Sequence, residues 1–143
     1  MKNKIAIITL HSVKNYGSVL QAYATQCYFE TLGLDAIIID FRRPWETNIG
    51  YWFFLTDKSI KGVARNILYF PSKIIQRFKY DKFKKKYLKT TKNTYVSLED
   101  FKNNPVDADY FCSGSDQVWN SGWNCGVIPE YFLDFVPKGE KKI

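Results

Sequence analysis

The sequence has few residues of the kind that hold metals or form covalent cross-links. Among 143 residues there is one histidine, His11, and three cysteines, Cys27, Cys112 and Cys125. An odd number of cysteines at unrelated spacings does not form a paired disulfide framework, and one histidine argues against a Cys/His zinc site. We therefore expect no metal or other cofactor and a reduced, cytoplasmic setting.

Long hydrophobic runs are also missing. The longest apolar stretch near the start, Ile5 to Leu10, is too short for a signal peptide, and polar His11 and Ser12 follow where a cleavage region would lie. No stretch approaches the roughly 20 apolar residues that span a bilayer. The sequence alone thus predicts a soluble protein.

The composition fits one α/β domain with a real core. The mass is 16.8 kDa, 45% of the residues are hydrophobic and 17% are aromatic. Basic residues exceed acidic ones by 21 to 14, and the excess gathers in one stretch: Lys79, Lys82, Lys84, Lys85, Lys86, Lys89 and Lys92. Three interpretations stay open for this stretch: a solvated helix face, a contact with an anionic membrane surface, or a nucleic-acid site, which no motif supports.

The first third of the chain predicts a strand, a helix and a second strand. The apolar run from Ile5 to Leu10 predicts a strand buried on both faces, and helical spacing follows over 18–32. Gly33 stands where a helix commonly ends in a left-handed residue, and Asp35 to Phe41 predicts the second buried strand. This order is typical of a βαβ unit with parallel strands.

Further elements are less regular. We expect helices over 60–69 and 72–88, with Pro71 starting the second, and a short helix over 98–103 capped by Ser97. Strands are predicted over 109–113 and 131–136, a loop over 119–126, and the start of another strand at 141–143. The aromatic cluster at 51–55 has no clear period.

The first candidate loop lies between the first strand and its helix, from His11 to Ser18. Ligands of open parallel sheets bind at the carboxyl ends of strands, and Gly17 would let free backbone N–H groups face an anion. A single glycine makes neither a dinucleotide fingerprint nor a P-loop. A plain turn with a Ser18 cap and an anion or sugar-phosphate contact both remain open.

The second candidate loop follows the strand at 109–113. Its small residues would allow close approach of a ligand, Asp116 could act as an acceptor or base, and Gln117 and Asn120 offer paired hydrogen bonds. Trp119 has a flat face of the kind that stacks on a sugar ring. The alternative is structural: Asp116 caps a helix and Trp119 fills the core.

Three strings make the sequence recognisable: TLH at 9–11, NYGSVLQAYA at 15–24 and GSDQVWN at 114–120. In this order they resemble the signature segments of the polysaccharide pyruvyl transferase family. The resemblance implies a Rossmann-like parallel sheet as the N-terminal half of a GT-B-like architecture, in which two such halves face each other across a cleft. It also implies transfer of the enolpyruvyl-derived group of phosphoenolpyruvate onto a sugar of a cell-surface or exopolysaccharide, which forms a pyruvate ketal.

The candidate site residues are of two kinds. The sequence leaves the catalytic residue unknown, and His11 and Asp116 are the candidates. The substrate-binding candidates are Asn15, Tyr16, Gly17, Ser18, Gln21, Gly114, Ser115, Asp116, Gln117, Trp119 and Asn120. No position matches the family's basic residues that hold phosphoenolpyruvate, or its proposed histidine acid. We therefore expect residues 1–143 to be an N-terminal domain, truncated before its C-terminal partner and inactive alone.

Two other functions remain open. One is a GT-B-like glycosyltransferase that uses a nucleotide sugar, and the other is a non-catalytic module that binds glycan or a partner protein. The implied partners are phosphoenolpyruvate, a glycan acceptor that could be lipid-linked, and the missing domain, but no nucleic acid. A peripheral contact at the inner membrane face would use Lys79, Lys82, Lys84, Lys85, Lys86 and Lys89.

Overall fold

The computed structural model describes residues 2–13, 15–47, 60–114 and 117–143, with the backbone alone for 60–66. Contacts between Cα atoms divide the chain into two units, residues 1–42 with 88–143 and residues 43–87. The predicted aromatic cluster at 51–55 lies outside the described residues.

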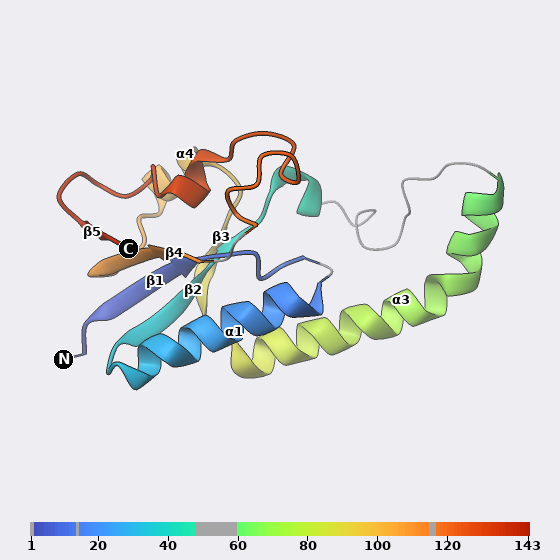
Figure 1. The fold of residues 1–143 in the computed structure, drawn as a ribbon, viewed down its shortest axis with the longest axis horizontal. Helices are drawn as coiled ribbons and strands as arrows, with labels where there is room; N and C mark the ends of the chain where they lie inside the picture. The colour runs from blue at the N-terminus through green and yellow to red at the C-terminus, as the bar shows by residue number, and fades with distance from the viewer. Residues whose placement is uncertain (1, 14, 48–59, 115–116) are drawn as a thin grey trace. The chain divides into compact units, whose positions relative to one another are not determined.

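Unit 1 is built on a parallel sheet of five strands in the order β3-β2-β1-β4-β5 (Figure 1). The strands are β1 (Lys4–Ile8), β2 (Asp35–Phe41), β3 (Thr90–Tyr95), β4 (Tyr110–Ser113) and β5 (Lys141–Lys142). β1 lies in the centre, with Ile7 beside Ile38 of β2 on one side and Cys112 of β4 on the other. The predicted α/β class with parallel strands is confirmed.

Alternate residues of the strands feed two cores, one on each face of the sheet. Ile5 and Ile7 pack with Ala22 of helix α1 (Tyr16–Thr31), whereas Ala6 and Ile8 face the opposite core. Helix α1 thus covers one face, and the segment with α4 (Leu98–Asn103) and the 3₁₀ helix η2 (Pro129–Phe132) covers the other (Figure 1). Burial on both faces explains why β1 and β2 read as continuous apolar runs.

Helix α1 begins and ends with capping residues. The Asn15 side chain accepts from the Gly17 backbone N–H at 2.8 Å, so Asn15 caps the helix, which begins at Tyr16 instead of Ser18. At the other end Gly33 has φ +83°, and the Leu34 N–H donates to the Phe29 carbonyl. The predicted left-handed Gly33 is confirmed, and so is the Ser97 cap of α4.

Two expectations about the strands are wrong or incomplete, and a third is confirmed. The predicted strand at 131–136 is η2 followed by turns, because Pro129 starts a helical turn and Leu133 ends it with φ +61°. Strand β3 has no counterpart among the predicted elements, because its polar sequence TTKNTY lies at the sheet edge and is largely exposed. The start of the last predicted strand is confirmed as β5.

Unit 2 contains the 3₁₀ helix η1 (Pro44–Glu46) and the long helix α3 (Ile60–Tyr87). Two helices were expected here, but α3 runs through Pro71. Proline removes one helical hydrogen bond and crowds the preceding turn, which bends a helix without always ending it; the α3 ribbon bends along its length (Figure 1). In η1, the Arg43 Nε and backbone N–H donate to the buried Glu46 carboxylate at 2.8 and 3.1 Å.

A stack of aromatic rings holds the α4 side of the sheet. Phe101 lies between Tyr95 and Phe135, with ring centroids 4.2 and 3.9 Å away and nearly parallel planes.

Phe101→Ala should therefore lower the free energy of unfolding by about 3–5 kcal/mol, as measured by urea denaturation. Tyr28→Ala, which removes a ring that is 59% exposed on α1, should cost less than about 1 kcal/mol. Equal losses for both variants would contradict this view of the core.

Candidate functional site

The recognised strings form two motif segments, one after β1 (9–11 and 15–24) and one after β4 (114–120). Their described residues meet where the strand order of the sheet reverses. From β1 the chain builds β2 and β3 on one side and then crosses to build β4 and β5 on the other. Open α/β sheets bind ligands in the crevice at this point, outside the carboxyl ends of the strands. Ile8 and Ser113 are register partners at these ends, so the residues after β1 and after β4 share one edge.

Gly114 makes the closest junction between the segments. Its N–H donates to the Ile8 carbonyl at 2.9 Å. A Cβ atom on Gly114 would lie 3.7 Å from the Gln21 amide nitrogen and 3.8 Å from the Thr9 Cβ. Thr9 Oγ1 donates to Gln21 Oε1 at 3.1 Å, and the Gln21 amide donates to Thr25 at 3.0 Å. The absence of a side chain at residue 114 thus leaves a small space beside Thr9 and Gln21.

Gln117 and Asn120 stabilise the turn that carries Trp119. The Asn120 side-chain amide donates to Gln117 Oε1 at 2.9 Å, and its oxygen accepts from the Trp123 backbone N–H at 3.1 Å. Asn124, which the sequence did not single out, is buried and donates to the carbonyls of Gln117 and Val118. The predicted loop is therefore a fixed turn.

Trp119 lies on the surface, and Val118 is the residue of this turn that enters the core. The Trp119 side chain is 60% exposed, its indole N–H donates to the Tyr131 carbonyl at 3.2 Å, and its ring stacks on Phe132. Phe132 is itself 47% exposed. The two rings form an exposed aromatic surface whose orientation is fixed by one hydrogen bond to the backbone; we call it the Trp119–Phe132 platform.

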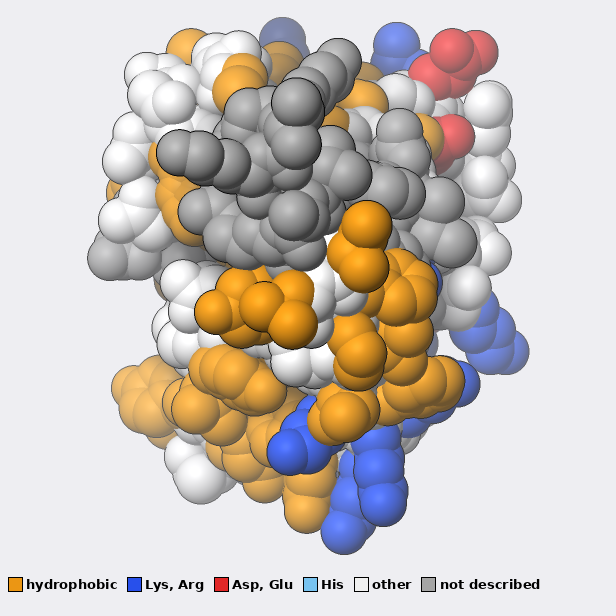
Figure 2. Space-filling model, turned by 90° about the vertical axis from the view of Figure 1, so that its right-hand side faces the viewer, with side chains coloured by type: hydrophobic (Ala, Val, Ile, Leu, Met, Phe, Trp, Pro, Cys, Tyr) orange, Lys and Arg blue, Asp and Glu red, His pale blue; other side chains and the backbone are white. Residues whose placement is uncertain are grey.

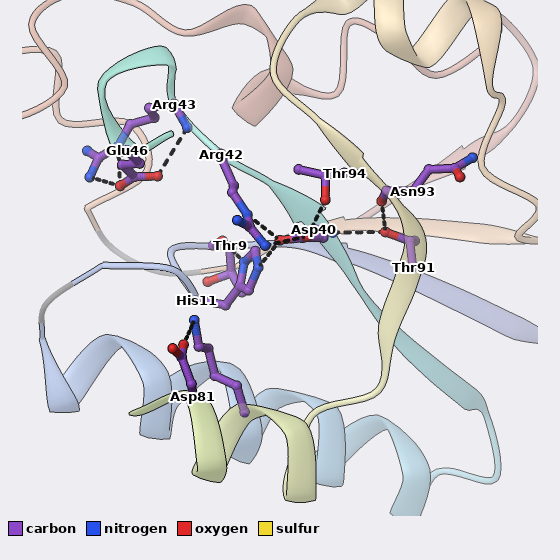
Figure 3. A network of polar contacts seen from close by, with 11 residues as sticks. Thr9, His11, Asp40, Arg42, Arg43, Glu46, Asp81, Thr91, Asn93 and Thr94 are labelled. Carbon is purple, nitrogen blue, oxygen red and sulfur yellow. Dashed lines mark hydrogen bonds and ion pairs between the residues drawn. The ribbon is translucent and has the colours of Figure 1, made fainter. Parts of the chain in front are cut away.

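His11 and Asp40 belong to a polar network that joins the ends of β1, β2 and β3 (Figure 3). The His11 Nε2 atom lies 2.9 Å from Asp40 Oδ1, and Nδ1 lies 3.2 Å from the Thr9 carbonyl. His11 is only 2% exposed, so both ring nitrogens face protein acceptors inside the fold. In this geometry His11 positions the loop after β1.

Asp40 accepts from three side chains. Besides His11, Arg42 donates through Nε and Nη2 at 3.0 and 2.9 Å, and Thr94 Oγ1 donates at 2.6 Å. Burial raises the pKa of Asp40, but the hydrogen bonds from His11, Arg42 and Thr94 together hold this pKa well below its ordinary value. The sequence analysis did not single out Asp40. Its position near the carboxyl end of a strand with a buried-type sequence could have indicated it.

Of the remaining predicted site residues, some are described by the structure and two are not. Tyr16, Gly17 and Ser18 form the first turn of α1, and Tyr16 is 52% exposed. Ser115 and Asp116 lie outside the described residues. Among the described residues, no three His, Cys, Asp or Glu side chains gather as metal ligands.

A hollow of about 470 Å³ lies elsewhere on unit 1. It begins at the amino ends of β1 and β2, beside Lys4 and Asp35, and continues along β3 to Tyr95. It is an open edge of the sheet without convergent buried polar groups, so the motif segments remain the better candidate site.

Unit 1 is an α/β domain with a five-stranded parallel sheet, and the motif segments lie at its topological switch point, where sheets of this kind commonly bind ligands. The family model described as polysaccharide pyruvyl transferase matches residues 15–143. The chain belongs to the polysaccharide pyruvyl transferase family, whose name denotes a transferase that acts on polysaccharide. No curated protein and no solved structure matches the chain.

The charge on Asp40 gives a test of the polar network. Asp40→Asn should lower the free energy of unfolding by about 2–3 kcal/mol at pH 7, because His11 and Arg42 lose a charged acceptor. Because the folded pKa of Asp40 is lowered, its contribution is complete above the unfolded value of about 4 and is lost as the pH falls further. Urea denaturation at pH 7, 5 and 3 should show the gap to wild type narrowing only at the lowest pH.

Asp134→Asn is the matched control, since Asp134 is exposed. It should change the free energy of unfolding by less than about 0.5 kcal/mol at each pH. A gap for Asp40→Asn that is unchanged at pH 3 would show that the carboxylate charge does not stabilise the network.

Proposed function

We propose that this chain takes part in the transfer of the enolpyruvyl-derived group of phosphoenolpyruvate onto a sugar of a cell-surface or exopolysaccharide, which yields a pyruvate ketal. The observation that carries the proposal is the meeting of both motif segments at the switch point of the sheet, with Gly114 beside Thr9 and Gln21. Membership of the family supports the same activity.

In this proposal the described residues serve mainly the acceptor sugar. Sugar rings present apolar C–H faces bordered by hydroxyl groups, so aromatic rings with nearby amide side chains suit them. The Trp119–Phe132 platform supplies the aromatic surface, and Gln117 and Asn120 lie before and after Trp119 on the same turn. We assign Asn15, Tyr16, Gly17 and Ser18 at the start of α1, together with Gln21 and Gly114, to the same site. We place Ser115 and Asp116 with them on sequence grounds.

The donor requires a different set of groups. Phosphoenolpyruvate carries a phosphate and a carboxylate, and its enol carbon must receive a proton, so fixed cations and an acid are needed. We propose that residues 1–143 form an N-terminal domain and that a second Rossmann-like domain faces it in a GT-B-like arrangement and supplies these groups. His11 and Asp116 remain catalytic candidates, although the contacts of buried His11 favour a positioning role.

We place the reaction on the cytoplasmic side of the membrane. Cys27, Cys112 and Cys125 are free thiols, and burial raises the pKa of Cys112, which keeps that thiol protonated. Exposed Cys125 is the thiol that an oxidising compartment would modify first.

The reaction itself is tested by the release of inorganic phosphate from phosphoenolpyruvate in the presence of a panel of glycans, using the protein that carries the proposed second domain. Glycan-dependent release is the expected result. Turnover of a nucleotide sugar without any use of phosphoenolpyruvate would favour a glycosyltransferase instead.

The acceptor role of Trp119 can be measured on the chain itself. Trp119→Ala should weaken glycan binding by about tenfold or more, as followed by saturation-transfer NMR or by the fluorescence of the other tryptophans. Trp123→Ala removes a ring that is 41% exposed on the same turn and should leave the affinity within about twofold. An equal loss in both variants would contradict a specific platform.

Gly114 provides a second test at the junction of the motif segments. Gly114→Ala should fold normally, because its Cβ would meet Ile7, Gln21 and Thr9 at 3.5–3.8 Å, which is ordinary contact. The added methyl would fill the space beside Thr9 and Gln21, so glycan affinity should fall roughly tenfold. Unchanged affinity in a variant with a wild-type melting temperature would place the ligand elsewhere.

A further inference from the structure

The positive charge of the chain belongs to one helix. α3 spans residues 60–87 and contains nine of the 21 basic residues but only one of the 14 acidic ones, Asp81. The rest of the sequence therefore has 12 basic and 13 acidic residues and is close to neutral, although the whole chain has a net charge of +7. Such a concentrated field attracts an anionic partner to α3 and not to the sheet.

The same helix exposes large apolar side chains. Ile67, Leu68, Ile75 and Phe78 are 71, 74, 55 and 71% exposed. With Pro71 they follow the three- and four-residue spacing of a single helix face. Exposed apolar groups that gather on one face indicate an interaction surface.

The lysines continue this face toward the C-terminus of the helix. Lys82 and Lys85 follow Phe78 at spacings of four and three residues, and Lys79 and Lys86 flank them; all four are exposed. We call the apolar residues 67, 68, 71, 75 and 78 together with lysines 79, 82, 85 and 86 the outer face of α3. In the space-filling view of Figure 2, hydrophobic side chains gather beside a group of Lys and Arg side chains.

Two of the six lysines that the sequence assigned to a membrane contact do not belong to the outer face. Lys84 pairs with Asp81 at 3.1 Å, near Tyr80, whose side chain is buried. Lys89 follows the helix and pairs with Glu30 at 2.7 Å and with Asp35 at 3.8 Å. Of the six lysines for which the sequence predicted a membrane contact, four therefore remain candidates: Lys79, Lys82, Lys85 and Lys86.

We propose that the outer face of α3 binds an anionic lipid surface. Among the described helices, none has the length and hydropathy to cross a membrane, but an interfacial helix needs only an apolar patch beside cations. The apolar side chains at 67, 68, 71, 75 and 78 would enter the boundary between headgroups and acyl chains, while the long lysine side chains reach lipid phosphates.

Charge complementarity selects a lipid surface over a folded protein. A protein partner would have to place a carboxylate against each of four lysines on mobile side chains, and exposed ion pairs of that kind stabilise little. An anionic bilayer presents many negative charges at once and accepts apolar side chains next to them. The inference does not depend on the proposed pyruvyl transfer, and its test uses no substrate.

The experiment is co-sedimentation of the full chain with vesicles of phosphatidylcholine alone or with one quarter phosphatidylglycerol. Binding should require the anionic lipid, and raising the salt from about 0.1 to 0.5 M should weaken it by at least about tenfold, because screening shortens the range of the charges. Equal binding to both vesicle types, or no binding to either, would overturn the proposal.

Two charge-matched variants locate the contact. Replacement of Lys79, Lys82, Lys85 and Lys86 by Gln should lower the partition coefficient by at least about tenfold. The control variant removes the same charge from four exposed lysines outside α3, namely Lys2, Lys92, Lys102 and Lys138. This variant should lower the partition coefficient by less than about threefold. Equal losses would show non-specific attraction by net charge and would overturn the proposal.

The apolar half needs its own variant. Ile75→Ser with Phe78→Ser should lower vesicle binding by at least about tenfold while circular dichroism remains that of wild type, because both side chains are exposed. Size-exclusion chromatography with light scattering is run alongside. Wild-type dimers that these serines convert to monomers would assign the outer face to a second copy of the chain and overturn lipid binding.

Discussion

The parallel pairing of β1 with β2 on one side and β4 on the other is the interaction on which the candidate site depends. These ladders place residues that are about a hundred positions apart at one edge of the sheet, so that Gly114 donates to Ile8 and lies beside Thr9 and Gln21. The apolar β1 can pair on both sides because α1 and the aromatic core cover its two faces. The strand order places the topological switch point at this edge, which is where open parallel sheets commonly bind ligands.

The polar network around Asp40 completes this edge. A carboxylate that is largely removed from water, as Asp40 is, needs its charge to be paired. His11, Arg42 and Thr94, from three different strand segments, provide this pairing. The network thus fixes the loop after β1 against β2 and β3. The helix α3 has the opposite character, with exposed lysines and apolar side chains on its outer face, and it accounts for the basic charge of the whole chain.

Much of the fold could be predicted where a residue pattern had a local physical cause. The run at 35–41, the left-handed Gly33 and the Ser97 cap each depend on neighbours in the sequence, and the structure confirms them. Strand β3 was missed because an edge strand needs no apolar pattern, and α3 was divided at Pro71 because local rules treat proline as a break. The strand expected at 131–136 failed because buried Tyr131 and Leu133 alternate in a 3₁₀ turn as they would in a strand.

The sequence by itself determined the βαβ start of the fold, the two motif segments and the family to which they point. Only the tertiary structure decided which residues these segments meet. It put Val118 into the core and left Trp119 exposed on Phe132, and it buried His11 against Asp40. The reason is physical: spacing along a strand or helix fixes which face a side chain occupies, but pairing between distant strands fixes its partners.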